Sequence, residues 1–183
     1  MQKMRSFLAI SLTLLLTGCM TMSGDGRRVE TQDVTSEALV HINAFRAKNG
    51  LKPVVADYNL VSIASRQVTV MANKDQLSHE VDGDFVKRMN AAGFRDAEAA
   101  ENVGAGHPNV ENAINAWIAS PHHRDNMLLK SGTRVAVVRA DAPWSRYRSY
   151  WALEISSQSA NGNSAASTFN MSSLPFISNL FGD

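Results

Sequence analysis

The chain has very few of the residues that cross-link small secreted domains: among its 183 residues, Cys19 is the single cysteine. No disulfide can form within the folded part, so its stability must come from its core. An excess of charge of one sign is missing as well, because the formal net charge is +1 and the lysines and arginines are scattered. A nucleic-acid-binding domain usually carries a clustered basic surface, so this composition excludes nucleic acid as the expected partner.

Long apolar runs are absent except near the start, where "FLAISLTLLL" follows the basic residues Lys3 and Arg5. A basic start, a short apolar run and small residues before a cleavage point are typical of a secretory signal peptide, and this run is too short to span a membrane. The residues "LTGC" that end it at Cys19 resemble a bacterial lipobox, in which the cysteine is lipidated and becomes the mature N-terminus. The alternative is an ordinary signal peptide followed by an incidental cysteine.

Lipidation of Cys19 would anchor the protein in a membrane of the cell envelope. Several acyl chains on one cysteine, palmitate among them, hold firmly because each buried CH₂ group contributes about 0.8 kcal/mol. The next residue is Met20, not the aspartate that usually retains a lipoprotein at the inner membrane. In a bacterium with two membranes, the predicted location is therefore the outer membrane.

Composition divides the chain into four segments. We expect a lipoprotein signal peptide over residues 1–18, a flexible tether over 19–34, one folded domain over 35–158 and a low-complexity tail over 159–183. The tail is rich in Ser, Asn, Gly and Ala, although its stretch "LPFISNLF" is suited to docking on an apolar groove.

Apolar periodicity within the domain predicts about four helices, which cover residues 36–49, 57–77, 84–92 and 109–120. Pro121 is expected to end the last of them. The β-branched run over 133–139 and the alternating run over 149–156 predict two strands joined by a hairpin. Helices placed before and between a few strands, without a βαβ rhythm, predict an α+β fold with a small antiparallel sheet.

Five stretches, taken in order, carry a resemblance to a known family: "AFRAKNGLKPV", "LSHE", "AENVGAG", "AWIASPHHRDNML" and "YWALEIS". Each is weak alone, but their order and spacing over about residues 37–156 are specific. On these motifs the chain is similar to the CAP superfamily of cysteine-rich secretory, antigen 5 and pathogenesis-related-1 proteins, and most similar to its bacterial, SCP-like branch. The resemblance implies an α-β-α sandwich of the CAP type over the folded domain.

The resemblance also implies which residues share a cleft. His79 of "LSHE", Glu101 of "AEN" and His123 of "SPHHR" match two histidines and one glutamate of the family's cleft. The second glutamate of the eukaryotic members falls at Ser120, which puts a mechanism with two carboxylates in doubt. The predicted cleft is completed by Asn102, Ser120 and Arg124.

Two neutral imidazoles and one carboxylate are a ligand set that Zn²⁺ takes in catalytic sites, where a fourth position stays open. His79, Glu101 and His123 are therefore tentative ligands of Zn²⁺ or another divalent metal. In the structural alternative, Glu101 accepts a hydrogen bond from one histidine and fixes its tautomer, while the other histidine bonds to backbone. His122 is expected to face solvent, because successive residues of a helix do not point the same way.

The predicted function is that of a lipid-anchored binding or interaction module of the cell envelope, with no residue assigned to catalysis. The alternative is a metal-dependent, peptidase-like hydrolase that uses His79, Glu101 and His123. Serine catalysis is disfavoured, because neither Ser78 nor Ser120 lies in a G-x-S-x-G turn. The partners implied are the membrane and an unidentified envelope or extracellular ligand, and the sequence specifies no oligomeric state.

Overall fold

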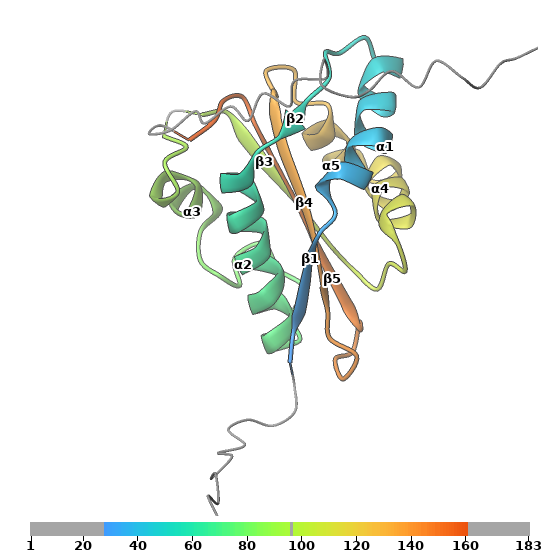
Figure 1. Cartoon of the computed structure of the whole chain (residues 1–183), viewed down its shortest axis with the longest axis vertical. Coiled ribbons are helices and arrows are strands. Elements are labelled where there is room, and N and C mark those ends of the chain that lie inside the picture. Colours follow the sequence, from blue (N-terminus) through green and yellow to red (C-terminus); the bar gives the residue numbers. More distant parts are fainter. Residues whose placement is uncertain (1–27, 96, 161–183) are drawn as a thin grey trace, which may run out of the picture.

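The structure is a computed structural model that describes residues 28–95 and 97–160 (Figure 1). The predicted signal peptide, Cys19, most of the tether and the tail after Ala160 lie outside the described residues. Among the helices of the described part, none combines the length and the apolar character that crossing a bilayer requires.

A five-stranded sheet runs through the middle of the domain, with helices on both of its faces (Figure 1). The strand order is β1-β4-β5-β3, and β2 also pairs with β4. Only the pairing of β2 with β4 is parallel among the pairings described. The strands are β1 (Glu30–Asp33), β2 (Val55–Ala56), β3 (Ala99–Ala105), β4 (Arg134–Asp141) and β5 (Ser149–Ser156).

The described helices are α1 (Thr35–Lys48), α2 (Tyr58–Lys74), α3 (Phe85–Ala91), α4 (Val110–Ala119) and α5 (Pro121–Met127). Alternate residues of β4 point to opposite faces of the sheet, as the pleat of a strand requires. Val135 and Val137 pack in one cluster with α1, α4 and α5, whereas Ala136 and Val138 pack against α2 and α3. The predicted α+β fold and its α-β-α sandwich are therefore confirmed.

The sequence does not predict β1, β2, β3 or α5, and the reasons are local. The four side chains of β1 are all exposed, so no apolar pattern marks this strand inside the predicted tether. Strand β3 has the sequence "AAENVGA", in which a glutamate, an asparagine and a glycine interrupt the alternation. Pro121 does follow the end of α4, but it also occupies the first turn of α5, where the fixed φ of proline suits a helix start.

The opening motif "AFRAKNGLKPV" has a structural role in this fold. The guanidinium of Arg46 is fully buried and donates hydrogen bonds to backbone carbonyls, those of Lys52, Met127, Leu129 and Gly132. One turn earlier, the side chain of Asn43 exchanges two hydrogen bonds with the backbone of Val54. The motif therefore ties the end of α1 to the chain before β2 and to the chain between α5 and β4.

Candidate functional site

The edge strand β3 carries the centre of the site, at Glu101 and Asn102. Successive residues of a strand point to opposite faces of the sheet. Accordingly, Glu101 contacts Arg88 on α3, whereas Asn102 contacts His123 on α5. The site therefore wraps around the edge of the sheet, and each face supplies one of the predicted histidines.

His79 lies in the irregular segment between α2 and α3, and the side chains of Gln67, which is buried, and Arg88 hold this segment. Nε2 of Gln67 donates to the carbonyls of Ser78 and His79, at 2.8 and 3.1 Å. Nη2 of Arg88 donates to the same His79 carbonyl at 3.1 Å. The side chain of His79 is 50% exposed, and its Nδ1 lies 2.8 Å from Oε1 of Glu101. The backbone of His79 is thus fixed from inside while its ring reaches the surface.

The carboxylate of Glu101 is buried, and both of its oxygens are engaged. Oε1 meets Nδ1 of His79, and Oε2 accepts from Nη2 of Arg88 at 2.8 Å. Burial alone would raise the pKa of Glu101, but its interactions with His79, Glu154 and Arg88 outweigh burial and hold the pKa below its ordinary value. An ionised carboxylate can only accept, so Nδ1 of His79 carries the hydrogen. In the neutral imidazole, Nε2 of His79 is then a free acceptor.

On the other face, two amide side chains, of which that of Asn102 is buried, tie α5 to β3. Nδ2 of Asn102 donates to the carbonyl of His123 at 2.9 Å. Nδ2 of Asn126 donates to Oδ1 of Asn102 at 2.9 Å and to the carbonyl of Glu101 at 3.1 Å. Glu101 therefore helps to position His79, and Asn102 helps to position His123.

The remaining members of the predicted cleft have structural contacts. Ser120 joins α4 to α5 and makes no side-chain capping hydrogen bond there. Nη1 of Arg124 donates to the carbonyl of Ile118 at 3.4 Å, near the end of α4. His122 is exposed, as predicted.

The imidazole of His123 lies within electrostatic reach of its neighbours. Burial, followed by the charges of His79 and His122, lowers the pKa of His123 below its ordinary value. Burial also lowers the pKa of His107, which lies in the loop after β3. At neutral pH these imidazoles are therefore uncharged, and they accept or donate hydrogen bonds without carrying a positive charge.

The contribution of His123 and His107 to stability should consequently fall as the pH drops below about 6.5, the ordinary pKa of histidine, while the raised pKa of Glu154 acts in the opposite direction. The unfolded chain takes up protons at His123 and His107 at a higher pH than the folded chain does, so acidification favours unfolding. Urea unfolding midpoints measured at steps between about pH 5 and pH 7.5 test this. On acidification His123→Gln should lose less stability than the wild type, and His122→Gln, which removes only the smallest of the three causes of the His123 shift, should lose nearly as much as the wild type. Equal pH dependence in wild type and His123→Gln would contradict the assignment to His123.

Two residues that the sequence analysis did not assign to the site, Glu154 and Arg88, complete it. The side chain of Glu154 on β5 is fully buried and lies opposite Glu101 in the register of β3 and β5. Nη1 of Arg88 lies 3.8 Å from Oε1 of Glu154. Burial, followed by the charge of Glu101, raises the pKa of Glu154 well above its ordinary value. The sequence does contain a signal for Glu154, because it is the single charged residue of the otherwise uncharged strand "SYWALEIS".

The predicted metal ligands do not form a three-ligand set in this arrangement. Both oxygens of Glu101 already accept from His79 and Arg88, and a guanidinium at 2.8 Å opposes a second cation at that carboxylate. Across residues 28–95 and 97–160, no group of three or more His, Cys, Asp or Glu side chains is arranged to hold a metal ion. Zinc binding through His79, Glu101 and His123 stays a prediction, and no step of the function is derived through a metal.

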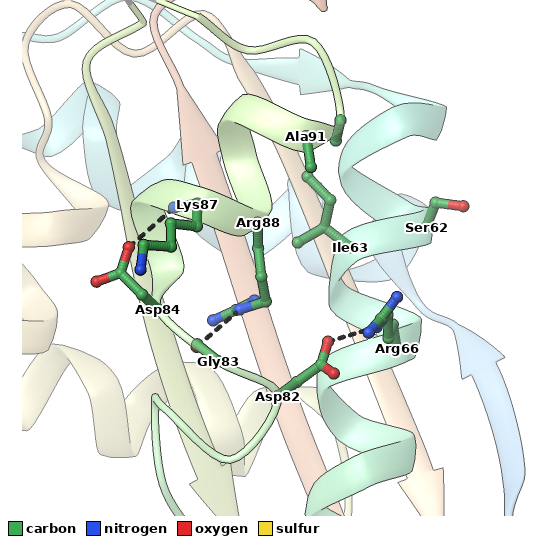
Figure 2. A pocket seen from close by; sticks show the side chains of 10 residues that line it. Ser62, Ile63, Arg66, Asp82, Gly83, Asp84, Lys87, Arg88 and Ala91 are labelled. Carbon is green, nitrogen blue, oxygen red and sulfur yellow. Dashed lines mark hydrogen bonds and ion pairs between the residues drawn. The ribbon is translucent and has the colours of Figure 1, made fainter.

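Two pockets of the described surface lie beside the site rather than on it. One, of about 470 Å³, opens between α2 and α3, and Figure 2 shows Arg88 in it, between the Asp84 and Lys87 side and the Arg66–Asp82 ion pair. The other, of about 480 Å³, is lined by residues of the loop after β3 and of the β4–β5 turn. Neither is lined by His79, Glu101 or His123, but Arg88 lines the first and also bonds to Glu101.

Serine catalysis finds no geometric support in the described part of the chain. Oγ of Ser78 accepts from the backbone N–H of Glu80, and neither Ser78 nor Ser120 makes a side-chain hydrogen bond to His79 or His123. A serine nucleophile requires a base within hydrogen-bond reach.

Most of the folded domain matches a known protein family. Residues 39–155 match the family model described as the cysteine-rich secretory protein family, CAP. The uncharacterized protein YkwD of Bacillus subtilis (strain 168) is 31% identical over 108 residues, which are 57% of this chain and 42% of YkwD. The chain thus spans less than half the length of this relative.

Three of the solved structures with a similar fold come from bacteria. An extracellular protein containing an SCP domain from Bacillus anthracis str. Ames has a TM-score of 0.56 at 22% identity, covering 66% of this chain and 39% of that one. An outer surface protein of Borrelia burgdorferi has a TM-score of 0.59 at 14% identity, covering 70% and 99%. A cysteine-rich secretory protein of Staphylococcus aureus subsp. aureus Mu50 has a TM-score of 0.53 at 19% identity, covering 68% and 40%. At these identities the likeness shows the fold.

Proposed function

Because the chain belongs to the cysteine-rich secretory protein (CAP) family, we propose that it is a lipid-anchored binding protein of the bacterial cell envelope. Its binding site is formed by His79 and His123 on the two sides of Glu101, and it acts without chemical turnover. An extracellular or surface location of two structural relatives supports the envelope as its place of action.

One observation carries the proposal: two imidazoles from different segments are held by buried polar side chains around one strand edge. Gln67 and Arg88 hold the backbone of His79, and Asn102 holds the backbone of His123. The hydrogen bonds of Gln67, Arg88 and Asn102 to these backbone carbonyls restrict where the two rings lie. A rigid pair of hydrogen-bonding rings is what a binding site needs, because ordering it on binding then costs little.

The ligand chemistry that suits this site is polar and uncharged or weakly charged. His79 presents an acceptor nitrogen, and His123 is uncharged at neutral pH because burial lowers its pKa. Hydroxyl and amide groups can donate to such rings. The glycan and peptide of the bacterial cell wall carry both kinds of group, so the cell wall is the ligand source that we propose.

We expect the protein to sediment with purified peptidoglycan sacculi, and we expect His79→Ala and His123→Ala each to weaken this binding. The loss of one or two hydrogen bonds corresponds to about a tenfold weaker affinity. The bound fraction is measured by co-sedimentation of the soluble chain from Met20 onward over a range of sacculus concentrations.

His122→Ala is the matched control, because His122 adjoins His123 but is exposed, and we expect it to bind as the wild type does. Wild-type protein that stays in the supernatant at every sacculus concentration would overturn the cell-wall proposal. Equal binding by wild type and both histidine variants would show that the sacculi are bound elsewhere. Release of soluble wall fragments during the assay would overturn the absence of turnover.

A further inference from the structure

Glu154 is the side chain of this site whose presence is least expected. It is fully buried in the middle of β5, and neither of its carboxyl oxygens has a hydrogen-bond partner among the described residues. It also stands directly across from Glu101 on the neighbouring strand. Burial and the charge of Glu101 raise the pKa of Glu154 well above its ordinary value and so favour its uncharged form, but a buried carboxyl still costs free energy unless it is compensated.

Arg88 is the group that compensates both carboxyls. Its Nη2 bonds to Glu101 at 2.8 Å, and its Nη1, which is buried and has no hydrogen-bond partner among the described residues, lies 3.8 Å from Glu154. The side chain is only 9% exposed, although it comes from a short surface helix and lines the open pocket between α2 and α3. The guanidinium thus lies against the sheet, where it bonds to Glu101 and faces the carboxyl of Glu154, instead of turning outward into that pocket.

From this position Arg88 also organises the segment that carries His79. It donates to the carbonyl of His79 at 3.1 Å and to that of Gly83 at 3.4 Å, and its guanidinium lies 5.5 Å from the centre of the Phe85 ring. One side chain therefore fixes the backbone of His79, the end of its segment and the carboxylate that holds its ring.

We propose that Arg88 and Glu154 are positioning residues for the imidazole of His79. Glu154 holds Arg88 against the sheet, Arg88 orients the carboxylate of Glu101, and Glu101 keeps the hydrogen of His79 on Nδ1. The outcome is a single tautomer whose Nε2 faces solvent as an acceptor. This inference rests on the proposed function in one respect, the class of ligand. The tautomer favours a ligand that donates a hydroxyl or amide hydrogen to Nε2.

The test reads the tautomer of His79 in the soluble chain without ligand, by long-range ¹H–¹⁵N spectra of ¹⁵N-histidine-labelled protein near pH 7.5. In the wild type we expect a bare Nε2 and a protonated Nδ1 at His79. In Glu154→Gln and Arg88→Met we expect mixed tautomers at His79, with the signals of His123 unchanged. Arg88→Lys keeps the cation and should restore part of the wild-type preference, because an ammonium lacks the fork that spans two carboxyls.

Arg66→Met is the control for the pocket itself, because Arg66 lines it and pairs with Asp82 without contacting Glu101. Its His79 spectrum should match that of the wild type. Wild-type His79 signals in both Glu154→Gln and Arg88→Met would overturn the inference. If Arg88→Met does not fold, Glu154→Gln and Arg88→Lys decide the matter, since neither removes the buried cation.

Sacculus binding by the same variants separates this inference from the proposed function. Mixed tautomers should be accompanied by about two- to tenfold weaker binding, the range expected for one weakened hydrogen bond. Mixed tautomers in a protein that never binds sacculi would refute the proposed ligand and leave the positioning role standing. Unchanged tautomers in a protein that does bind would refute the positioning role alone.

Discussion

Arg46→Met is expected to lower the free energy of unfolding by about 3–5 kcal/mol, measured by urea denaturation of the soluble chain. The guanidinium of Arg46 has no exposed surface, and its hydrogen bonds all go to backbone carbonyls. Methionine matches the length of the arginine stem but donates nothing, so all four carbonyls, of which those of Met127 and Gly132 are buried, would lose their partner. A domain of this size is stable by only about 5–15 kcal/mol, so the variant would be close to unfolding.

Two further variants give this prediction its controls. Arg46→Lys should recover only part of the loss, because an ammonium cannot reproduce the planar spread of a guanidinium over separate carbonyls. Arg66→Met should leave the unfolding midpoint unchanged, since the Arg66 side chain is 74% exposed. A midpoint for Arg46→Met equal to that of Arg66→Met would show that water or repacking satisfies the carbonyls.

Cys19→Ala is expected to move the protein from the membrane fraction of the cell almost completely into the soluble fraction. The prediction follows from the "LTGC" sequence and from the acyl chains that we propose on this cysteine, each of which contributes about 0.8 kcal/mol per buried CH₂ group. The measurement is detergent phase partitioning of wild type and variant, combined with metabolic labelling by an alkyne analogue of palmitate. Label should appear in the wild type and be absent from Cys19→Ala.

The neighbouring residue supplies a matched control for location in a bacterium with two membranes. Met20→Asp should keep the label and the partitioning of the wild type but shift the protein from the outer to the inner membrane. Label retained by Cys19→Ala would place the acyl chains elsewhere. Equal release of wild type and Cys19→Ala without label would support the ordinary signal peptide instead of the lipoprotein.

The sequence predicts the helices of this fold better than its sheet. Helix α2 runs from Tyr58 to Lys74, close to its expected range, because a stripe of buried residues repeats with the helical period. Strand β3 carries half of the site, yet it escapes detection because polar and glycine residues interrupt its pattern. An element that is not expected cannot be given a register, and the register is what brings Glu154 opposite Glu101.

Contacts that a sequence pattern cannot predict also explain which residues of the site were found from the sequence and which were missed. His79, Glu101 and His123 lie in short motifs and were found by resemblance, and the structure links Glu101 directly to His79. Arg88 and Gln67 act through contacts between different elements, which no short motif contains. Gln67 even occupies a position in the apolar stripe of α2, where a pattern that counts apolar residues reads it as an interruption.

The pairing of β1 with β4 also determines at which end of the sheet the N-terminal side of the domain lies. The described chain enters the sheet at Glu30, which pairs with Asp141 beside the β4–β5 turn (Figure 1). Glu101 and Glu154 lie level with Ala136, five residues back along β4 and so about 16 Å from that end. If the domain is attached to a membrane through its N-terminal side, the attachment lies at one end of the sheet and the histidines lie toward the other. A ligand could then reach the histidines without contacting the attachment.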